Sequence, residues 1–296
     1  MSRQPVEKAT FRQRAFVALQ HILPQHLLSR CVYRAARSEW RPGKDFLIRS
    51  FLRGFTVDMS EAAEPDPFAY PSFNAFFTRA LRGDARPIDP DPQALVSPVD
   101  GTVSQAGHID DRALIQAKGH HFSLEALLAG DGALVETFRH GEFATLYLAP
   151  YNYHRVHMPL EGALSATVHV PGRLYSVNTA TAAQVPELFA RNERVICTFD
   201  TPRGRLGMVL VGALFVGSMS TIWAGEVTPS PGRRPALLPP PPSPLRLARG
   251  AEMGRFNMGS TVILLLERGR VSWADSLRVG ATVRLGQRIG TCAAPV

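Results

Sequence analysis

The stretch Gly254–Glu267, GRFNMGSTVILLLE, joins a strand pattern to a small polar corner. Its apolar run, Val262–Leu266, predicts a buried strand. The corner before this run, Gly259–Thr261, places a serine hydroxyl beside a peptide carbonyl, and glycine leaves the backbone there free to adopt unusual conformations. The stretch therefore predicts either an ordinary turn into a strand or a place where the chain reacts with itself.

Short apolar runs of the same kind recur from Val96 onward and alternate with glycine and proline turns. They include ATLYLAP, RVICTF, MVLVGALFVG and TVILLLE. Helices are expected from about Ser123 to Leu128, with Ser123 as N-cap, and around Val185 to Arg191. The last stretch, SLRVGATVRLGQRIGT, predicts a closing hairpin. The predicted fold class is α+β and mainly β, with a mainly antiparallel domain of β-sandwich or barrel-like form.

The N-terminal residues, from about Phe11 to Arg53, have the apolar spacing of helices, with Pro24 as a break. Arginines are interleaved with the apolar side chains. Such helices either lie in a membrane interface or cover the core of the main domain. A loop and a short helix are expected from Glu64 to Phe77. We predict that residues 1–60 form a helical membrane-associating region and that residues 61–296 form a mainly β catalytic domain.

The 296 residues carry a formal net charge of +8, and arginine supplies most of the positive charge. This balance suggests an anionic partner, either nucleic acid or an acidic membrane surface, with a biased use of arginine as the competing explanation. Cys31, Cys197 and Cys292 are widely spaced, which argues against a disulfide framework and for a reducing compartment. The N-terminal sequence lacks the apolar core of a signal peptide.

Two segments need separate interpretation. Leu206–Gly225, LGMVLVGALFVGSMSTIWAG, is uncharged over a length that would cross a bilayer. Its glycines, serines and β-branched residues favour two buried strands joined at a glycine-rich bend instead of a membrane span. Pro229–Pro244 contains four consecutive prolines and predicts a surface loop or linker.

Three places combine reactive side chains with tight turns: SPVDGTVS, APYNYHRVHMP and the MGST corner. In the first, Asp100 precedes a glycine, which alone is a common structural turn. In the second, His154 and His157 lie three positions apart. On a strand they would face opposite sides, which disfavours a shared metal ion, although a turn would allow one. A structural role for either histidine is the simpler alternative.

Aspartate, histidine and serine, in that chain order, are the parts of a charge relay. The acid orients the imidazole, and the imidazole takes the proton of the serine hydroxyl. The sequence has no GxSxG elbow of the kind that α/β-hydrolases use. Ser260 instead follows a glycine at the start of a strand, which suits attack on the Gly259 carbonyl immediately upstream.

The segment EMGRFNMGSTVI resembles the cleavage segment of the bacterial phosphatidylserine decarboxylase proenzymes, usually written LGST, with Met258 in place of the leucine. Further segments that match this family are YHRVHMP, SPVDGTVS, QAKGHHFSLEALL, FARNERVICTFDT and FNAFFTRALRGDARPID. The resemblance runs from the helical N-terminal region to the last strand. The exchange of leucine for methionine conserves volume. The proline-rich loop matches no motif of the family.

The resemblance implies that Asp100, His157 and Ser260 form a self-cleavage relay. His157 would remove the proton of Ser260, and Asp100 would hold the imidazole in the required tautomer. The serine oxygen would attack the Gly259 carbonyl, and β-elimination would release Gly259 as a new C-terminus. The residue left at position 260 would lose ammonia and become a pyruvoyl group.

The products would be a large β chain, residues 1–259, and a small α chain, residues 260–296. The resemblance implies that the pyruvoyl group made from Ser260 is the covalent cofactor and forms a Schiff base with the amine of phosphatidylserine. Its conjugated carbonyl would accept electrons as CO2 leaves and phosphatidylethanolamine forms. His154 resembles the family residue that supplies the proton in this step, with substrate positioning or a structural role as alternatives.

The resemblance also implies a peripheral protein on the cytoplasmic face of the cell's inner membrane, active in phospholipid biosynthesis. Its partners would be phosphatidylserine, the anionic membrane surface and its own two chains as a heterodimer, with a dimer of heterodimers left open. Neither a metal ion nor a nucleic acid is expected.

Three other functions stay open at this point. A serine hydrolase would use the same three residues on another molecule and keep Ser260 intact. A non-enzymatic lipid- or nucleic-acid-binding β module would leave HRVH and MGST unexplained. A pyruvoyl enzyme for a soluble amino acid would have no use for the N-terminal helices.

Overall fold

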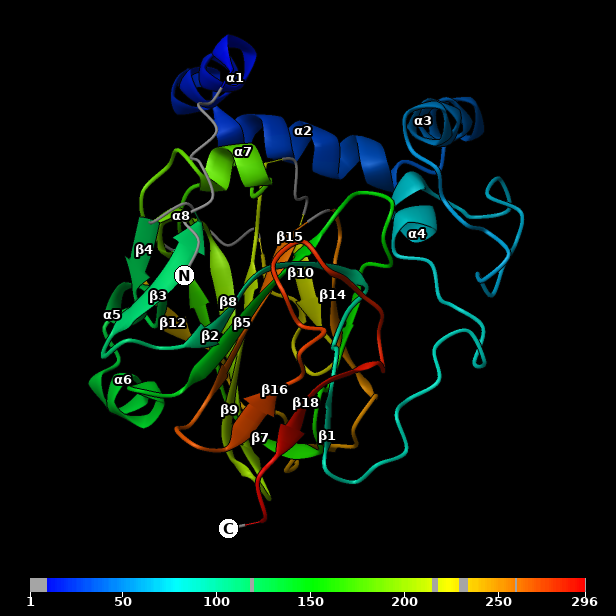
Figure 1. Cartoon of the computed structure of the whole chain (residues 1–296). Helices are drawn as coiled ribbons and strands as arrows, with labels where there is room; N and C mark the ends of the chain where they lie inside the picture. The colour runs from blue at the N-terminus through cyan, green and yellow to red at the C-terminus, as the bar shows by residue number, and fades with distance from the viewer. Residues whose placement is uncertain (1–9, 118–119, 215–217, 229–233, 259, 296) are drawn as a thin grey trace.

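The computed structural model describes residues 10–117, 120–214, 218–228, 234–258 and 260–295. Helices form the N-terminal part, and the strands lie from residue 94 onward (Figure 1). The helices are α1 (Phe11–Ile22), α2 (Gln25–Arg37), α3 (Arg41–Gly54), α4 (Phe73–Phe77), α5 (Leu124–Leu127), α6 (Gly132–Phe138), α7 (Thr179–Ala182) and α8 (Leu188–Arg191).

One large antiparallel sheet runs through the apolar core. Within the described residues its strands follow, in spatial order, as β12 (Ala236–Leu237), β7 (Gly162–Val170), β8 (Arg194–Thr201), β9 (Gly204–Val211), β15 (Ser260–Leu266), β5 (Glu142–Leu148), β2 (Gly101–His108) and β17 (Thr282–Val283), with β13 (Arg246–Leu247) also on β7. β15 is the predicted apolar strand, and it is paired on both sides, with β9 and β5. Val262–Leu266 are all buried, so both faces of the strand are covered, which explains why its sequence is almost continuously apolar.

Smaller antiparallel sheets pack around the large one. Their strands, in spatial order, are β11 (Gly225–Glu226), β10 (Met219–Thr221), β14 (Glu252–Phe256) and β6 (Arg155–His157); then β1 (Ala94–Val96), β18 (Arg288–Cys292) and β16 (Val271–Trp273); then β3 (Ala113–Ala117) and β4 (His120–Ser123). The predicted α+β, mainly β and mainly antiparallel fold is confirmed.

Several local predictions are also confirmed. Ser123 caps α5 by accepting a hydrogen bond from the backbone N–H of Ala126. The segment Leu206–Gly225 contains strands β9 and β10, although residues 215–217, at the expected bend, lie outside the described residues. Among the described residues, no helix has the length and apolar character needed to cross a membrane.

The predicted closing hairpin near the C-terminus is wrong. β17 pairs with β2, whereas β18 lies in another sheet between β1 and β16. The alternating pattern of this segment identified strands correctly, but their partners come from distant parts of the chain. A smaller correction applies to Pro229–Pro244, where Ala236 and Leu237 form the short strand β12 on β7; residues 229–233 lie outside the described part.

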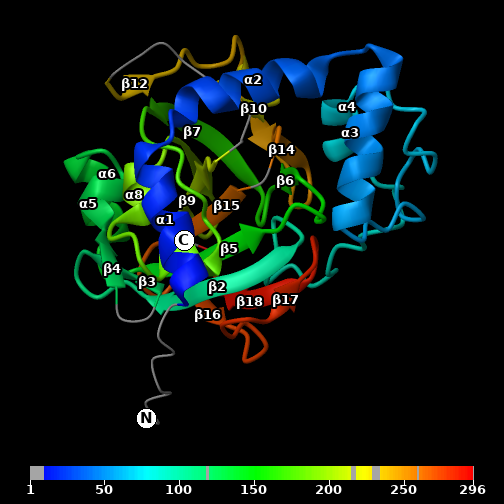
Figure 2. The ribbon, with the colours of Figure 1, turned by 90° about the horizontal axis from the view of Figure 1, so that it is seen from above.

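Helices α1 and α2 cross one end of the strands, and α3 lies to the side above α4 (Figures 1 and 2). The buried side of α1 and α2 is unusually polar, whereas α3 buries Ile48. Gln20 and Gln25 are buried and accept hydrogen bonds from the backbone N–H groups of Ser176 and Leu174, at 2.7 and 2.9 Å. Large apolar side chains of the same helices are exposed instead: Phe11, Phe16, Leu19, Ile22, Leu27 and Phe46. In α1 and α2 this arrangement is the reverse of that in a helix that covers a core.

A cluster of aromatic side chains joins α3 and α4 to the β region. Phe73, Phe76 and Phe77 of α4 are buried and pack with Ile48 of α3. Met258, directly before the predicted cleavage bond, packs against this cluster. The helical region therefore contacts the segment that contains the predicted cleavage bond.

Candidate active site

The backbone brings the three motifs identified in the sequence together. The N–H of His157, in β6, donates to the carbonyl of Pro98 in SPVDGTVS at 2.9 Å. β6 also pairs with β14, the strand that leads into the MGST corner. On the other side of that corner, Ser260 opens β15 opposite Leu148, the last residue of β5. The loop that follows Leu148 carries His154 into the same region.

The imidazole of His157 is held in one tautomer. Its Nδ1 lies 2.8 Å from the Gly250 carbonyl, which can only accept, so Nδ1 carries the proton. Nε2 therefore has a lone pair, and the Tyr153 hydroxyl lies 3.1 Å from it as a donor. Burial lowers the pKa of His157, while the Gly250 hydrogen bond and the charges of Glu252 and Asp100 work in the opposite direction. The imidazole is thus a neutral base, and Nε2 is the nitrogen that can accept a proton.

Asp100 makes contacts other than the predicted one. Its carboxylate accepts hydrogen bonds from Arg86 Nε and Nη2, at 2.9 and 2.6 Å, and from the Leu285 N–H at 2.8 Å. Among the described residues, no hydrogen bond joins Asp100 to His157, and the Gly250 carbonyl fixes the tautomer instead. Burial alone would lower the pKa of Arg86, but its bonds to Asp100 and Glu61 raise it above the ordinary arginine value.

His154 occupies different surroundings from His157. Its ring is fully buried and stacks on Phe77, with the ring centroids 4.1 Å apart. Nε2 lies 3.3 Å from the Pro150 carbonyl and so carries the proton of the neutral ring, while Nδ1 has no partner. Burial lowers the pKa of His154 to about 3, so the ring is neutral at physiological pH. In the described chain, no group of three or more His, Cys, Asp or Glu residues is placed to hold a metal ion.

The segment before the predicted cleavage bond is anchored and strained. Asn257 is buried and donates to the hydroxyls of Ser218 and Ser220, at 2.7 and 3.0 Å. Met258 has φ of 139°, a backbone conformation that side chains other than glycine rarely adopt and that costs about 1–3 kcal/mol. Gly259 lies outside the described residues, and Ser260 is described only through its backbone in β15.

Buried polar atoms without partners lie in the elements next to position 260. The next residue, Thr261, is fully buried, and its hydroxyl Oγ1 has no hydrogen-bond partner. His154 Nδ1, in the loop after β5, is another buried atom without a partner. Buried polar atoms without partners are costly and rare, so they mark positions where a polar group completes the site.

A cavity of about 170 Å³ is lined by Asp100 and by Tyr153, the hydrogen-bond partner of His157. Its lining includes Asp100 and the loop after β5; the complete set is Thr56, Asp58, Glu61, Arg79, Leu81, Arg86, Asp100, Tyr151, Asn152 and Tyr153. Burial raises the pKa of Tyr153 to about 12, so this phenol keeps its proton and donates it toward His157. The cavity gives access to the region around the predicted relay.

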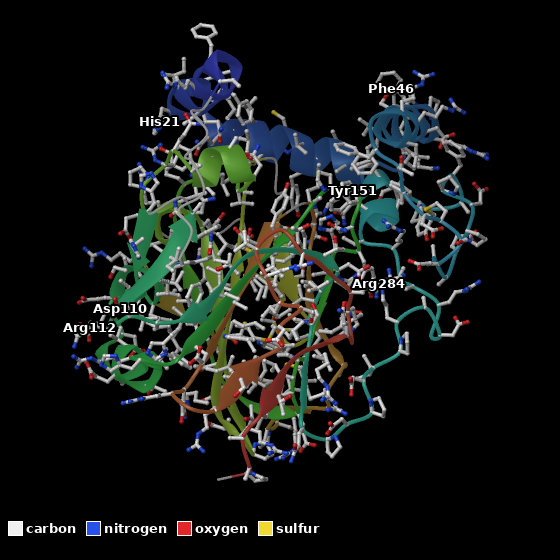
Figure 3. The ribbon with its side chains drawn as sticks, in the orientation of Figure 1. His21, Phe46, Asp110, Arg112, Tyr151 and Arg284 are labelled. Atoms are coloured by element: carbon white, nitrogen blue, oxygen red, sulfur yellow. The ribbon has the colours of Figure 1, made fainter. Side chains whose placement is uncertain are left out.

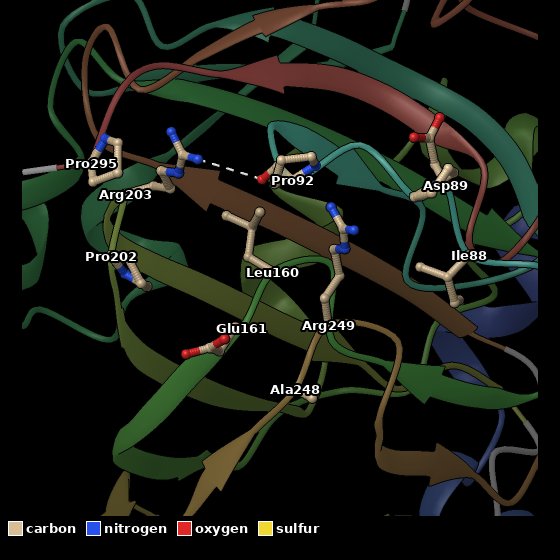
Figure 4. Close-up of a pocket in the computed structure, with 11 residues that line it drawn as sticks. Ile88, Asp89, Pro92, Leu160, Glu161, Pro202, Arg203, Ala248, Arg249 and Pro295 are labelled. Carbon is tan, nitrogen blue, oxygen red and sulfur yellow. Dashed lines mark hydrogen bonds between the residues drawn. The ribbon is translucent and has the colours of Figure 1, made fainter.

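A cavity of about 510 Å³ lies elsewhere and contains none of the predicted site residues (Figure 4). Two of its arginines make hydrogen bonds to backbone carbonyls, Arg203 to Pro92 at 3.4 Å and Arg249 to Ala94 at 3.1 Å. Figure 4 shows these two side chains on either side of Leu160. Because they tie separate chain segments together, we assign them a structural role.

Sequence reasoning missed several residues that shape the site. Tyr153 stands in the quoted motif YHRVHMP, where a phenol beside two histidines could have been noticed as a hydrogen-bonding partner. Arg86 and Arg79 lie in FNAFFTRALRGDARPID, but nothing in that pattern shows which acid either one meets. Gly250 acts through its carbonyl, and a backbone group leaves no signal in the sequence.

Comparison with known proteins gives one consistent family. The sequence model described as phosphatidylserine decarboxylase matches residues 73–291, and a second, described as PSD, matches residues 15–56. A protein from Azotobacter vinelandii is 53% identical over 281 residues, which cover 94% of this chain and 98% of the relative. One from Bordetella avium is 50% identical over 280 residues, which cover 95% of each chain. Both relatives are named phosphatidylserine decarboxylase proenzyme. The chain described here belongs to the phosphatidylserine decarboxylase family.

Proposed function

We propose that this protein cuts its own Gly259–Ser260 bond, converts Ser260 into a pyruvoyl group and then decarboxylates phosphatidylserine to phosphatidylethanolamine and CO2. The observation that carries the proposal is the state of His157. The Gly250 carbonyl holds Nδ1–H, so the free lone pair is on Nε2. This base lies in β6, which pairs with the strand that leads into the cleavage segment.

In the proposed maturation, His157 Nε2 takes the proton of the Ser260 hydroxyl, and the oxygen attacks the Gly259 carbonyl. The amide becomes an ester, β-elimination releases Gly259 as a carboxylate, and the dehydroalanine at position 260 hydrolyses to a pyruvoyl group and ammonia. The Tyr153 hydroxyl donates to Nε2 before the reaction. The serine therefore displaces Tyr153 or passes its proton through that hydroxyl.

Asp100 contributes through its charge in this proposal. The bonds from Arg86 and Leu285 fix its carboxylate, and its negative charge raises the pKa of His157 against the effect of burial. A nearby negative charge stabilises the imidazolium that forms when His157 takes the serine proton. The strained backbone of Met258 favours the same step, because cutting the chain one residue later lets it relax.

The pyruvoyl group supplies a conjugated carbonyl that accepts the electrons released with CO2. We assign proton delivery after CO2 loss to His154, whose Nδ1 has no other partner. Stacking on Phe77 and the Pro150 carbonyl fix the ring plane. Although burial keeps the free ring neutral, an anionic substrate beside it raises its pKa and favours the protonated form that donates.

An intact-mass measurement on denatured, freshly purified protein tests the proposed function. Two chains are expected, and the smaller one should begin at position 260 with the mass of a pyruvoyl residue in place of serine. A single unmodified chain from protein that decarboxylates phosphatidylserine would overturn the pyruvoyl mechanism. A single chain that hydrolyses esters would identify Ser260 as an ordinary nucleophile.

We also propose that α1, α2 and α3 dock on an anionic membrane surface and place the protein peripherally on the cytoplasmic face of the inner membrane. In α1 and α2, large apolar side chains are exposed while Gln20 and Gln25 face the protein, and α3 exposes Phe46. Figure 3 shows Phe46 directed away from the body of the molecule. Exposed arginines on these helices, such as Arg30, Arg34 and Arg49, would add attraction to acidic headgroups.

The double variant Ile22→Asp, Phe46→Asp tests this docking. Binding to vesicles that contain phosphatidylserine should fall at least tenfold, because each exposed apolar side chain contributes about 1.5–3 kcal/mol when it leaves water. Turnover of a dispersed short-chain phosphatidylserine should stay within about twofold. Val279→Asp, an exposed apolar position outside these helices, is the control and should bind vesicles normally. Equal losses with vesicles and with dispersed substrate would instead assign the two side chains a structural role.

A further inference from the structure

Arg79 follows α4 and is buried without a counter-charge. Its side chain is only 4% exposed. Nη2 makes one long contact, 3.4 Å to the Tyr151 carbonyl, and Nε has no hydrogen-bond partner. In the part of the chain that the structure describes, no carboxylate lies within 4.0 Å of this guanidinium. Burial lowers the pKa of Arg79, but arginine keeps its charge in proteins.

Its neighbours in the 170 Å³ cavity are neutralised differently. Arg86 pairs with both Asp100 and Glu61, at 2.6 and 2.7 Å. Asp58, at the exposed rim, accepts hydrogen bonds from the backbone and hydroxyl of Ser60. Arg86 and Arg284 take up the carboxylates of Glu61 and Asp100, and among the described residues Arg79 has no ion-pair partner of its own, although the more distant charge of Asp100 acts on it. A buried charge of this kind is costly unless an anion completes the site.

The cavity is lined by the loop that follows β5. Tyr151 and Tyr153 line it from the loop that follows Leu148, and Leu148 is the strand partner of Ser260. Figure 3 shows Tyr151 below α3, on the side of the molecule that carries Phe46. An anionic headgroup that enters this cavity from a membrane on the helical face reaches Arg79, which lines the cavity together with the loop that follows the strand partner of Ser260.

We propose that Arg79 binds the phosphodiester of phosphatidylserine and so positions the serine headgroup beside residue 260, an inference that rests on the proposed function. The unpartnered Nε–H and the weakly bonded Nη2 lie on one edge of the guanidinium, which can hold two phosphate oxygens.

The substrate carboxylate is the poorer ligand for this residue. It loses its charge as CO2 departs, so an ion pair to Arg79 would stabilise the ground state more than the transition state and slow the reaction. The phosphodiester keeps its charge throughout. Arg79 therefore binds the phosphodiester equally strongly in the ground state and in the transition state. Loss of this interaction should raise KM and leave kcat unchanged.

Arg79→Gln is the test variant, and Arg82→Gln, an exposed arginine three residues away, is its control. Both should split normally in an intact-mass measurement. With dispersed short-chain phosphatidylserine, Arg79→Gln should raise KM about 10- to 100-fold, with kcat within about twofold of wild type. With the matching O-methyl phosphotriester, which keeps the skeleton but removes the charge, wild type and Arg79→Gln should have the same KM.

An unchanged KM for the diester in Arg79→Gln, or an equal rise for diester and triester, would overturn the proposal. A loss in kcat alone would also reject it and would place Arg79 in the chemical step. If Arg79→Gln fails to fold or split, the wild-type enzyme still decides. Its KM should be at least tenfold higher for the triester than for the diester, and equal values reject the proposal.

These outcomes are separate from a failure of the proposed function. In that case the wild-type protein would show no splitting and release no CO2 from either substrate. A wild-type protein that decarboxylates diester and triester with the same KM would leave the function intact and remove only the role of Arg79.

Discussion

The variant His157→Ala is expected to accumulate as an uncut and inactive chain. Loss of the imidazole removes the Nε2 lone pair, which is available because Nδ1–H donates to the Gly250 carbonyl. Serine is a poor nucleophile without such a base. Denaturing electrophoresis and intact mass should show one chain with an unmodified serine at position 260. Release of CO2 from labelled phosphatidylserine should fall to background, because no pyruvoyl group is made.

The matched control is His108→Ala, which removes a half-exposed histidine paired with Glu142. It should split as wild type does. Complete splitting of His157→Ala would remove His157 from the maturation step, whatever its effect on decarboxylation.

The same base gives maturation a defined pH dependence. His157 acts when neutral, and burial lowers its pKa below the ordinary histidine value. The rate of splitting should therefore rise with pH through this lowered pKa and be flat from about pH 7 upward. A time course with newly synthesised chain between about pH 5 and pH 8 measures it. A rate that still rises steeply above pH 7 would point to a base other than His157.

The second large effect is expected from His154→Gln, which should split fully and decarboxylate about 10²- to 10⁴-fold more slowly, the usual contribution of a general acid. Glutamine retains an N–H that can donate to the Pro150 carbonyl, so the loop should keep its conformation. The measurement is kcat on dispersed phosphatidylserine after the pyruvoyl content has been determined by mass.

His154→Ala provides a harsher comparison, because it also leaves a cavity against Phe77. A wild-type rate in His154→Gln would exclude proton delivery by this residue. Failure of both variants to split would move His154 into the maturation step.

The sequence was sufficient for the elements near the site because their signals are local. The run Val262–Leu266 predicted β15, and the serine at 123 predicted a cap that the structure contains. The C-terminal segment shows the limit. Alternation identifies strands, but β17 and β18 find their partners in β2 and β1, far away in the chain, and no local pattern encodes that choice.

The same limit applies to the site. Asp100, His157 and Ser260 were singled out by residue type and motif, and they remain the proposed relay. Which atom orients His157 was beyond sequence reasoning, since Gly250 lies 93 positions away and acts through its carbonyl. Asp100 contacts Arg86 because a loop folds back over the turn that contains Asp100. The burial of Arg79 likewise results from the tertiary fold, which no local sequence pattern shows.

The position of β15 determines whether the mature protein can refold after it has been denatured. The strand is inserted between β9 and β5, so a cut at its first residue leaves the short chain held on both sides by the long one. Before the cut, refolding is a unimolecular event. Afterwards, two separate chains must meet again, and the denatured long chain exposes strands with an empty place between them. Urea-denatured His157→Ala should therefore recover its fold on dilution, whereas the mature protein should aggregate. Maturation thus makes unfolding irreversible.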